Sequence, residues 1–141
     1  MSLSESVILK LIDKAEKART FSFSPYSNFS VGAAILCKNG EFFTGCNIES
    51  EVFAPSICAE RVALFKTLSD GQKEFLAIAI VGGKSDESKI QKFCPPCGVC
   101  RQILSEFCNE ENFEVILYDG KNYRLFKLRD LLPERFKVNE N

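Results

Sequence analysis

The segment that decides the fold is Leu76-Ala77-Ile78-Ala79-Ile80-Val81, a continuous apolar run. A short run of this kind is typical of a strand that is buried on both faces, because a strand with one wet face alternates apolar and polar residues. Strands of that type lie inside a sheet that carries helices on both sides. We therefore expect residues 76–81 to form a central strand of an α/β domain.

The segments around this strand show the periods of helices and of a hairpin. Apolar residues recur with a helical period over 4–19, and a loop with Pro25 leads to a strand over 29–36. A turn at 38–40 joins that strand to a returning strand over 42–46. The other expected elements are a helix over 57–68 with Ser56 as its N-cap, a helix from 95–98 through Phe107, strands over 113–118 and 123–126, and a helical turn over 127–132. This order predicts a three-layer α-β-α sandwich with a mixed sheet.

Length and charge limit what such a protein does. The chain has 141 residues, which suits a single domain spanning 1–141 with a loose tail at 138–141. Its formal net charge is −1, and its basic residues are interleaved with acidic ones, apart from a mildly basic stretch at 121–129. Because binding to polyanions relies on a basic patch, we expect no nucleic-acid partner.

The sequence shows neither a membrane span nor an export signal. No apolar run approaches the length that crosses a bilayer. The segment 1–20 mixes acidic and basic residues with aliphatic ones, which indicates an amphipathic helix and not a signal peptide. We expect a cytoplasmic protein without a membrane partner, and access to the nucleus stays open.

The chain has no histidine and seven cysteines. The missing histidine excludes Ser-His-Asp and Cys-His catalysis and every metal site with a His ligand. An odd number of cysteines in a chain without an export signal points to metal binding or catalysis ahead of disulfides. Cys37, Cys46 and Cys108 are expected to be small buried apolar residues.

The other cysteines include three with the spacing of metal ligands. Cys97 and Cys100 lie three residues apart in the first turn of an expected helix, so their side chains project from one face. Cys58 lies in the first turn of another expected helix, and helix N-termini favour thiolate over thiol. Three thiolates leave one position of a tetrahedral zinc ion open, where a water becomes acidic enough to react at neutral pH. Glu60, two residues after Cys58, is the expected proton carrier.

Cys94 keeps a structural alternative open. Cys94, Cys97 and Cys100 are evenly spaced, so Cys94 could complete a closed four-thiolate site of a catalytically silent, zinc-stabilised binding module. A residue before proline favours extended backbone, so we expect Cys94 to precede the helix and to point elsewhere. Arg61 is the candidate for a cation that offsets part of the thiolate charge.

Four motifs together resemble those of the small, zinc-dependent, homotetrameric cytidine deaminases. In chain order they are Tyr26-Ser27-Asn28-Phe29-Ser30-Val31-Gly32-Ala33-Ala34, Gly45-Cys46-Asn47-Ile48-Glu49, Cys58-Ala59-Glu60-Arg61 and Pro96-Cys97-Gly98-Val99-Cys100-Arg101-Gln102. Cys-x-Glu followed by Pro-Cys-x-x-Cys is the all-thiolate form of the zinc deaminase signature. The resemblance extends from the first helix to Pro133. It implies a mixed five-stranded sheet and a homotetramer whose active sites are completed by neighbouring subunits.

The resemblance also implies a reaction and its central residues. Cys58, Cys97 and Cys100 match the ligands of one zinc ion per subunit, and Glu60 matches the proton shuttle. The implied reaction is the hydrolytic deamination of cytidine and deoxycytidine to uridine and deoxyuridine, with release of ammonia, in pyrimidine salvage. The expected partner is thus a small nucleoside.

Further matches concern substrate binding. Asn47 and Glu49 match the pair that binds the ribose 3′-hydroxyl. Phe29 and Phe53 match aromatic positions near the substrate, and Phe136 matches a C-terminal aromatic residue that stacks on the pyrimidine from another subunit. For these aromatic residues, ordinary core or interface packing is the alternative.

The loop after Glu49 departs from the family pattern. Glu51 stands where the family commonly has a small residue that reaches a neighbouring site near the ribose. A carboxylate there repels a 5′-phosphate, which favours a nucleoside over a nucleotide. Two relatives remain as rivals. A deaminase of the blasticidin S type is disfavoured by the ribose pair, and a polynucleotide-editing deaminase is disfavoured by the missing basic groove and by cysteine at position 58.

Overall fold

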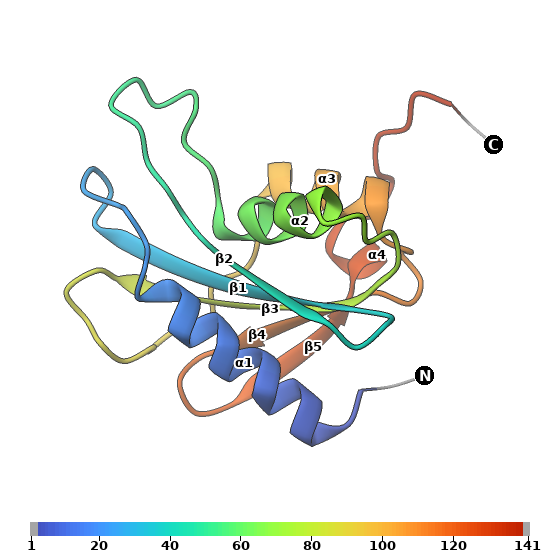
Figure 1. The fold of residues 1–141 in the computed structure, drawn as a ribbon, viewed down its shortest axis with the longest axis horizontal. Helices are drawn as coiled ribbons and strands as arrows, with labels where there is room; N and C mark the ends of the chain where they lie inside the picture. The colour runs from blue at the N-terminus through green and yellow to red at the C-terminus, as the bar shows by residue number, and fades with distance from the viewer. Residues whose placement is uncertain (1–2, 140–141) are drawn as a thin grey trace.

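The computed structural model describes residues 3–139 (Figure 1). Those residues form the helices α1 Glu5–Arg19, α2 Ala59–Ser69, α3 Gly98–Phe107 and α4 Leu128–Leu131. They also form the strands β1 Phe29–Cys37, β2 Phe42–Cys46, β3 Phe75–Lys84, β4 Glu114–Tyr118 and β5 Tyr123–Lys127. The strands make one sheet in the order β2-β1-β3-β4-β5. Because β3 and β4 pair in parallel and the other neighbours pair antiparallel, the expected mixed five-stranded sheet is confirmed.

Helices cover both faces of this sheet. α1 crosses one face, and α2, α3 and α4 lie on the other (Figure 1). The side chains of β3 alternate between the two layers. Ala77, Ala79 and Val81 pack with α1, whereas Ile78 and Ile80 pack with α2 and α3, and all five are completely buried. The expected burial of this strand on both faces is confirmed.

The first helix follows directly from its sequence. The hydroxyl of Ser4 accepts a hydrogen bond from the backbone N–H of Val7 at 3.3 Å and caps the N-terminus. Glu5 in the first turn and Arg19 in the last turn suit the helix dipole. Leu11 is fully buried against the sheet, and burying one leucine side chain contributes about 2 kcal/mol.

The start of α2 differs from the expected one. Ser56 does not cap this helix; its hydroxyl accepts a hydrogen bond from the backbone N–H of Ser50 at 2.9 Å. Cys58 is the N-cap instead. The reason is a pair formed by Ile48 and Ile57, whose backbone groups exchange hydrogen bonds of 3.0 and 2.9 Å. This pairing keeps the chain extended up to Cys58.

Smaller differences occur at other positions. Cys97 is the N-cap of α3 and not a member of its first turn. The strand expected to end at residue 81 continues to Lys84 because it pairs with β1 along its whole length. Cys46 is half-buried, whereas Cys37 and Cys108 are buried as expected.

The chain ends are only partly described. Residues 1–2 of the expected N-terminal segment 1–20, and residues 140–141 of the expected tail 138–141, lie outside the described residues. Val138 is exposed. Over residues 3–139, no helix combines the length and the apolar character that a membrane crossing requires.

Gly45 in β2 lets α2 approach the sheet closely. A Cβ atom at this position would lie 2.5 Å from the backbone nitrogen of Ala63 and 2.7 Å from the carbonyl oxygen of Ala59. Both atoms belong to the helix backbone, which cannot rotate aside as a flexible side chain can. The absence of a side chain at Gly45 therefore fixes how near the first turn of α2 lies to β2.

Gly45→Ala is expected to destabilise the protein by about 3 kcal/mol or more, because α2 has to move away from β2. Thermal unfolding at a fixed protein concentration measures this as a clear drop in the midpoint. Gly98→Ala is the control, since a Cβ atom there meets no atom within 4 Å. Its stability should stay within about 1 kcal/mol of wild type. Equal midpoints for the two variants would contradict the contact.

Candidate functional site

Three cysteine thiols meet where α2 and α3 begin. Cys58 and Cys97, the N-caps of the two helices, have their Sγ atoms 3.8 Å apart. Cys100 lies in the first turn of α3, and its backbone N–H donates to Sγ of Cys97 at 3.4 Å. The three Sγ atoms lie within 4.8 Å of one another. Among residues 3–139, no other group of three or more potential ligands is gathered in this way.

The geometry of this cysteine trio fits a zinc ion. Zn–S bonds of about 2.3 Å in a tetrahedral site hold two sulfur ligands roughly 3.8 Å apart, which is the separation of Cys58 and Cys97. Hydrogen bonding from Cys100, and then from Arg61, lowers the pKa of Cys58 to about 5 despite its burial. Thiolate is the form that binds metal. Since the described residues supply three ligands and not four, one position is left for water, as in catalytic zinc sites.

Arg61 places a positive charge beside the trio. Its Nη2 donates a hydrogen bond to Sγ of Cys58 at 3.5 Å. Its Nε is buried and has no hydrogen-bond partner within the described part of the chain. The guanidinium therefore lies at the position expected of a cation that offsets part of the thiolate charge.

Cys94 lies close to the trio without joining it. Its Sγ packs against β3, where a Cβ atom on Gly82 would come within 2.6 Å of it. Two prolines at 95–96 restrict the backbone that joins it to α3. Burial raises the pKa of Cys94 to about 12, and nearby negative charge adds to the shift. A protonated thiol outside the trio argues against the closed four-thiolate site.

Glu60 lies in the first turn of α2, and only 4% of it is exposed. Burial raises the pKa of Glu60 to about 7, and negative charge on Cys58 acts in the same direction. The carboxyl group therefore stands beside the trio with a proton affinity suited to general acid and base chemistry.

A pocket of about 350 Å³ opens beside these groups, a size typical of small-molecule sites. Its lining joins Cys58, Cys97 and Glu60 to Asn47 and Glu49, which follow β2. The structure thus brings together the expected metal, proton-transfer and sugar-binding residues.

Several pocket residues were not singled out from the sequence. Val31, Ile57 and Pro95 also line the pocket. Apolar side chains carry no chemical signature, so only nearness in sequence to the cysteines could have marked Ile57 and Pro95. Val31 reaches the pocket because β1 lies next to β2 in the sheet.

The amide of Asn47 is held by neighbouring groups. Its Oδ1 accepts hydrogen bonds from the backbone N–H of Val31 at 2.9 Å and from the hydroxyl of Ser22 at 2.5 Å. Its Nδ2 donates to the carbonyl of Phe29 at 2.8 Å. Two bonds to Oδ1 and one from Nδ2 leave a single amide N–H of Asn47 without an acceptor among the described residues.

Glu49 is an acceptor that is fixed by a loop. Its Oε1 accepts from the backbone N–H groups of Tyr26 and Ser27 at 3.0 and 3.1 Å, and its Oε2 accepts from the hydroxyl of Ser27. Hydrogen bonding from the Ser27 hydroxyl lowers the pKa of Glu49. An ionised carboxylate therefore lines the same pocket as the amide of Asn47.

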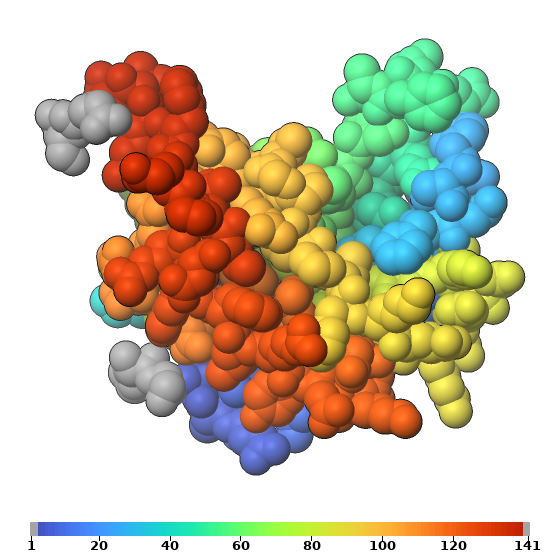
Figure 2. All heavy atoms as spheres, turned by 180° about the vertical axis from the view of Figure 1, so that it is seen from behind, coloured from blue at the N-terminus to red at the C-terminus, as the bar shows by residue number. Residues whose placement is uncertain are grey.

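The three aromatic candidates lie in different places. Phe29 begins β1, and its ring packs over Gly82. Phe53 is 69% exposed, and its ring meets that of Tyr26 edge to face at 5.9 Å. Phe136 is 70% exposed. These three aromatic residues are absent from the pocket lining formed by the described residues. Figure 2 shows the loop around residue 53 and the C-terminal segment as projections on either side of a hollow.

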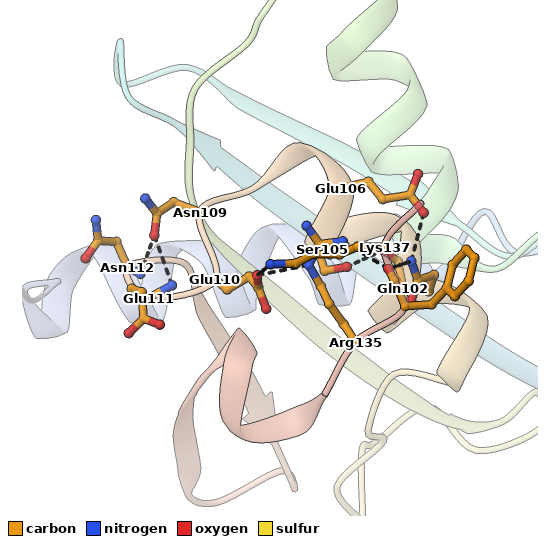
Figure 3. Close-up of polar contacts among 10 residues, drawn as sticks. Gln102, Ser105, Glu106, Asn109, Glu110, Glu111, Asn112, Arg135 and Lys137 are labelled. Carbon is orange, nitrogen blue, oxygen red and sulfur yellow. Dashed lines mark hydrogen bonds and ion pairs between the residues drawn. The ribbon is translucent and has the colours of Figure 1, made fainter. Parts of the chain in front are cut away.

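Polar contacts hold the C-terminal segment against α3 and the turn after it (Figure 3). Nε2 of Gln102 donates to the carbonyl of Phe136 at 3.1 Å. Nε of Arg135 donates to Oε1 of Glu110 at 2.9 Å, and Nζ of Lys137 lies 3.9 Å from the same oxygen. The backbone that carries the exposed ring of Phe136 is therefore fixed in place.

Known proteins are similar to the chain over nearly its whole length. The family model for the cytidine and deoxycytidylate deaminase zinc-binding region matches residues 5–115. A cytidine deaminase of Halalkalibacterium halodurans is 44% identical over 130 residues, which cover 92% of this chain and 94% of that protein. A blasticidin-S deaminase of Bacillus cereus is 30% identical over 133 residues, with 93% of each covered. The crystal structure of cytidine deaminase from Burkholderia pseudomallei superposes with a TM-score of 0.81 at 37% identity, covering 95% of this chain and all of that one.

Replacing any member of the trio is expected to remove the metal. Wild-type protein should bind one zinc ion per chain, and Cys58→Ala, Cys97→Ala and Cys100→Ala should each lose nearly all of it, because two thiolates hold zinc far more weakly than three. Metal analysis after gel filtration with a weak chelator measures the content. Cys94→Ala is the matched control and should keep its zinc. Loss of zinc from that control would favour the four-thiolate site.

Proposed function

The chain belongs to the cytidine and deoxycytidylate deaminase family, and we propose that it hydrolyses the C4 amine of free cytidine and deoxycytidine. The products are uridine or deoxyuridine and ammonia. The observation that carries this proposal is the pocket, whose lining joins zinc-binding thiols and buried Glu60 to the Asn47 and Glu49 pair. A cytosine nucleoside matches both halves of this pocket. Its base carries an amine for the half with the thiols and Glu60, and its sugar carries hydroxyls for Asn47 and Glu49.

Glu60 is the proton carrier of the proposed reaction. Zinc held by Cys58, Cys97 and Cys100 supplies the Lewis acidity that makes a water molecule reactive at neutral pH. The carboxylate of Glu60 takes the protons of that water one at a time and delivers one to N3 and one to the departing amine. All atoms of the water are accounted for. Its oxygen becomes the C4 carbonyl oxygen of uridine, one hydrogen ends on N3, and the other is released in ammonia.

The surroundings of Glu60 support this role. Burial raises its pKa to about 7, so the same carboxyl can accept and release a proton near neutral pH. The charge of three thiolates exceeds that of a zinc ion by one, so the loaded centre is not a net cation next to Glu60. Arg61, which donates to Cys58, offsets part of the remaining negative charge.

The sugar end of the proposed site is complementary to one hydroxyl group. Asn47 offers a single N–H donor, and Glu49 offers a carboxylate acceptor in the same pocket. A hydroxyl group can accept from the first and donate to the second. We assign this pair to the 3′-hydroxyl. No residue is assigned to the 2′-hydroxyl, so deoxycytidine is the second substrate.

The proposed active form is a homotetramer in which neighbouring subunits complete each site. Phe53 and Phe136 support it, because both rings are largely exposed in the single chain. Stacking on a pyrimidine would shield the ring of Phe136 from water. We further propose that residues 1–141 act as one catalytic domain in cytoplasmic pyrimidine salvage.

Glu60→Gln should keep its zinc and lose activity by about 100-fold to 10,000-fold, because an amide cannot carry the proton. The fall in near-ultraviolet absorbance as cytosine becomes uracil measures the rate, and metal analysis checks the zinc. Glu41→Gln, an exposed change at the β1–β2 turn, should turn over normally. Near-normal turnover by Glu60→Gln would disprove its assignment. If the wild-type protein deaminates blasticidin S faster than cytidine, its substrate is blasticidin S and the proposed cytidine deaminase activity is wrong.

The proposed assembly can be tested through the C-terminal segment. Sedimentation should give four times the 15.8 kDa mass of the chain. Phe136→Ala should raise KM for cytidine about 10-fold, since base–aromatic stacking contributes about 1–3 kcal/mol. Val138→Ala changes another exposed residue of the same segment and should leave KM unchanged. A fully active monomer would contradict the assembly.

A further inference from the structure

A chain of serine hydroxyls leads away from Asn47 into the protein. The hydroxyl of Ser22 donates to Oδ1 of Asn47 at 2.5 Å and lies 3.1 Å from Oγ of Ser24. Oγ of Ser24 lies 3.0 Å from those of both Ser30 and Ser85, which are 2.8 Å apart. Four hydroxyls from the loop after α1, from β1 and from the residue that follows β3 are thus linked to one amide.

The direction of donation in this chain is fixed at Asn47. Its Oδ1 carries no proton and can only accept, and the amide cannot be turned over, because Oδ1 and Nδ2 are bonded to backbone groups of opposite type in β1. Ser22 has one hydroxyl proton, and that proton goes to Asn47. The contact with Ser24, in which Ser22 is also the donor, shares that proton and is the longer of the two, 3.1 Å against 2.5 Å.

The inner end of the chain is rigid. Ser24 and Ser30 are buried. The guanidinium of Arg19, also buried, donates from Nε to the carbonyl of Ser30 at 2.9 Å and from Nη2 to the carbonyl of Lys84 at 2.7 Å. These bonds join the end of α1 to β1 and β3. They fix Ser30, whose hydroxyl contacts that of Ser24, and Ser24 in turn contacts Ser22.

We propose that Ser22 is a positioning residue for recognition of the sugar. By donating to Oδ1 of Asn47, it polarises the amide, which strengthens donation from the remaining N–H to the substrate hydroxyl. Ser22 itself does not line the pocket with Asn47. This role rests on the proposed function, in which Asn47 binds the 3′-hydroxyl of a cytosine nucleoside.

Removal of this hydroxyl leaves the rest of the site intact. The backbone N–H of Asn47 bonds to the carbonyl of Val31 at 3.3 Å, and its carbonyl accepts from Phe23 at 3.1 Å. The side-chain bonds of Asn47 to β1 are also independent of Ser22. Ser22→Ala is therefore expected to fold and to keep Asn47 near its place, with a weaker donor toward the sugar.

The test compares cytidine with 3′-deoxycytidine on the same preparations. Ser22→Ala should raise KM for cytidine about 3-fold to 10-fold, the effect of one hydrogen bond, and leave kcat within about 2-fold. KM for 3′-deoxycytidine, which lacks the hydroxyl, should stay within about 2-fold of its wild-type value. Because both substrates meet the same enzyme, the fraction of folded protein cancels. Ser22→Thr keeps the hydroxyl and should restore KM for cytidine.

Ser88→Ala is the control, because Ser88 lines the neighbouring pocket with Ser22 and Ser24 without belonging to the hydroxyl chain. It should leave both KM values unchanged. An equal rise in KM for the two nucleosides would show a merely structural role for Ser22, and no rise with cytidine would show no role; either result overturns the inference. A wild-type protein that deaminates neither nucleoside refutes the proposed function before any variant is compared.

Discussion

The contact between β2 and α2 at Gly45 is the constraint on which the site depends. It places the first turn of α2 against the sheet, with Ala59 completely buried. The residues on either side of Ala59, namely Cys58 and Glu60, line the pocket. One helix–strand contact therefore positions a metal ligand and a proton carrier together, and neither needs a long side chain to reach its place.

The topology of the sheet brings the other ligands to the same edge. β2 and β3 are both antiparallel to β1 and therefore run in the same direction. The helices that follow these strands, α2 and α3, consequently both begin beyond their carboxyl ends, which is where open α/β sheets generally bind ligands. Two helix N-termini then face one centre, and their partial positive charge suits a site that binds metal through thiolates.

Most of the fold and the chemical core of the site could be predicted from the sequence, because both leave local patterns. The continuous apolar run of β3 and the spacing of Cys97 and Cys100 are examples. The N-cap of α2 could not be predicted, since Ser56 is the better local cap and the long-range pair of Ile48 with Ile57 overrides it. The part played by Ser22 was hidden for the same reason, because a serine in a loop gains meaning only from what folds against it.

Cys94 lies close enough to the cysteine trio that its placement decides whether the zinc site is open or closed. Gly82 provides the space in which its Sγ packs, and a side chain at that position would collide with the thiol. A fourth thiolate added to the trio would fill the last coordination position. The zinc site would then be a structural site without catalytic activity. Gly82 therefore helps to keep one coordination position of the trio open, because it gives Cys94 a place to pack against β3.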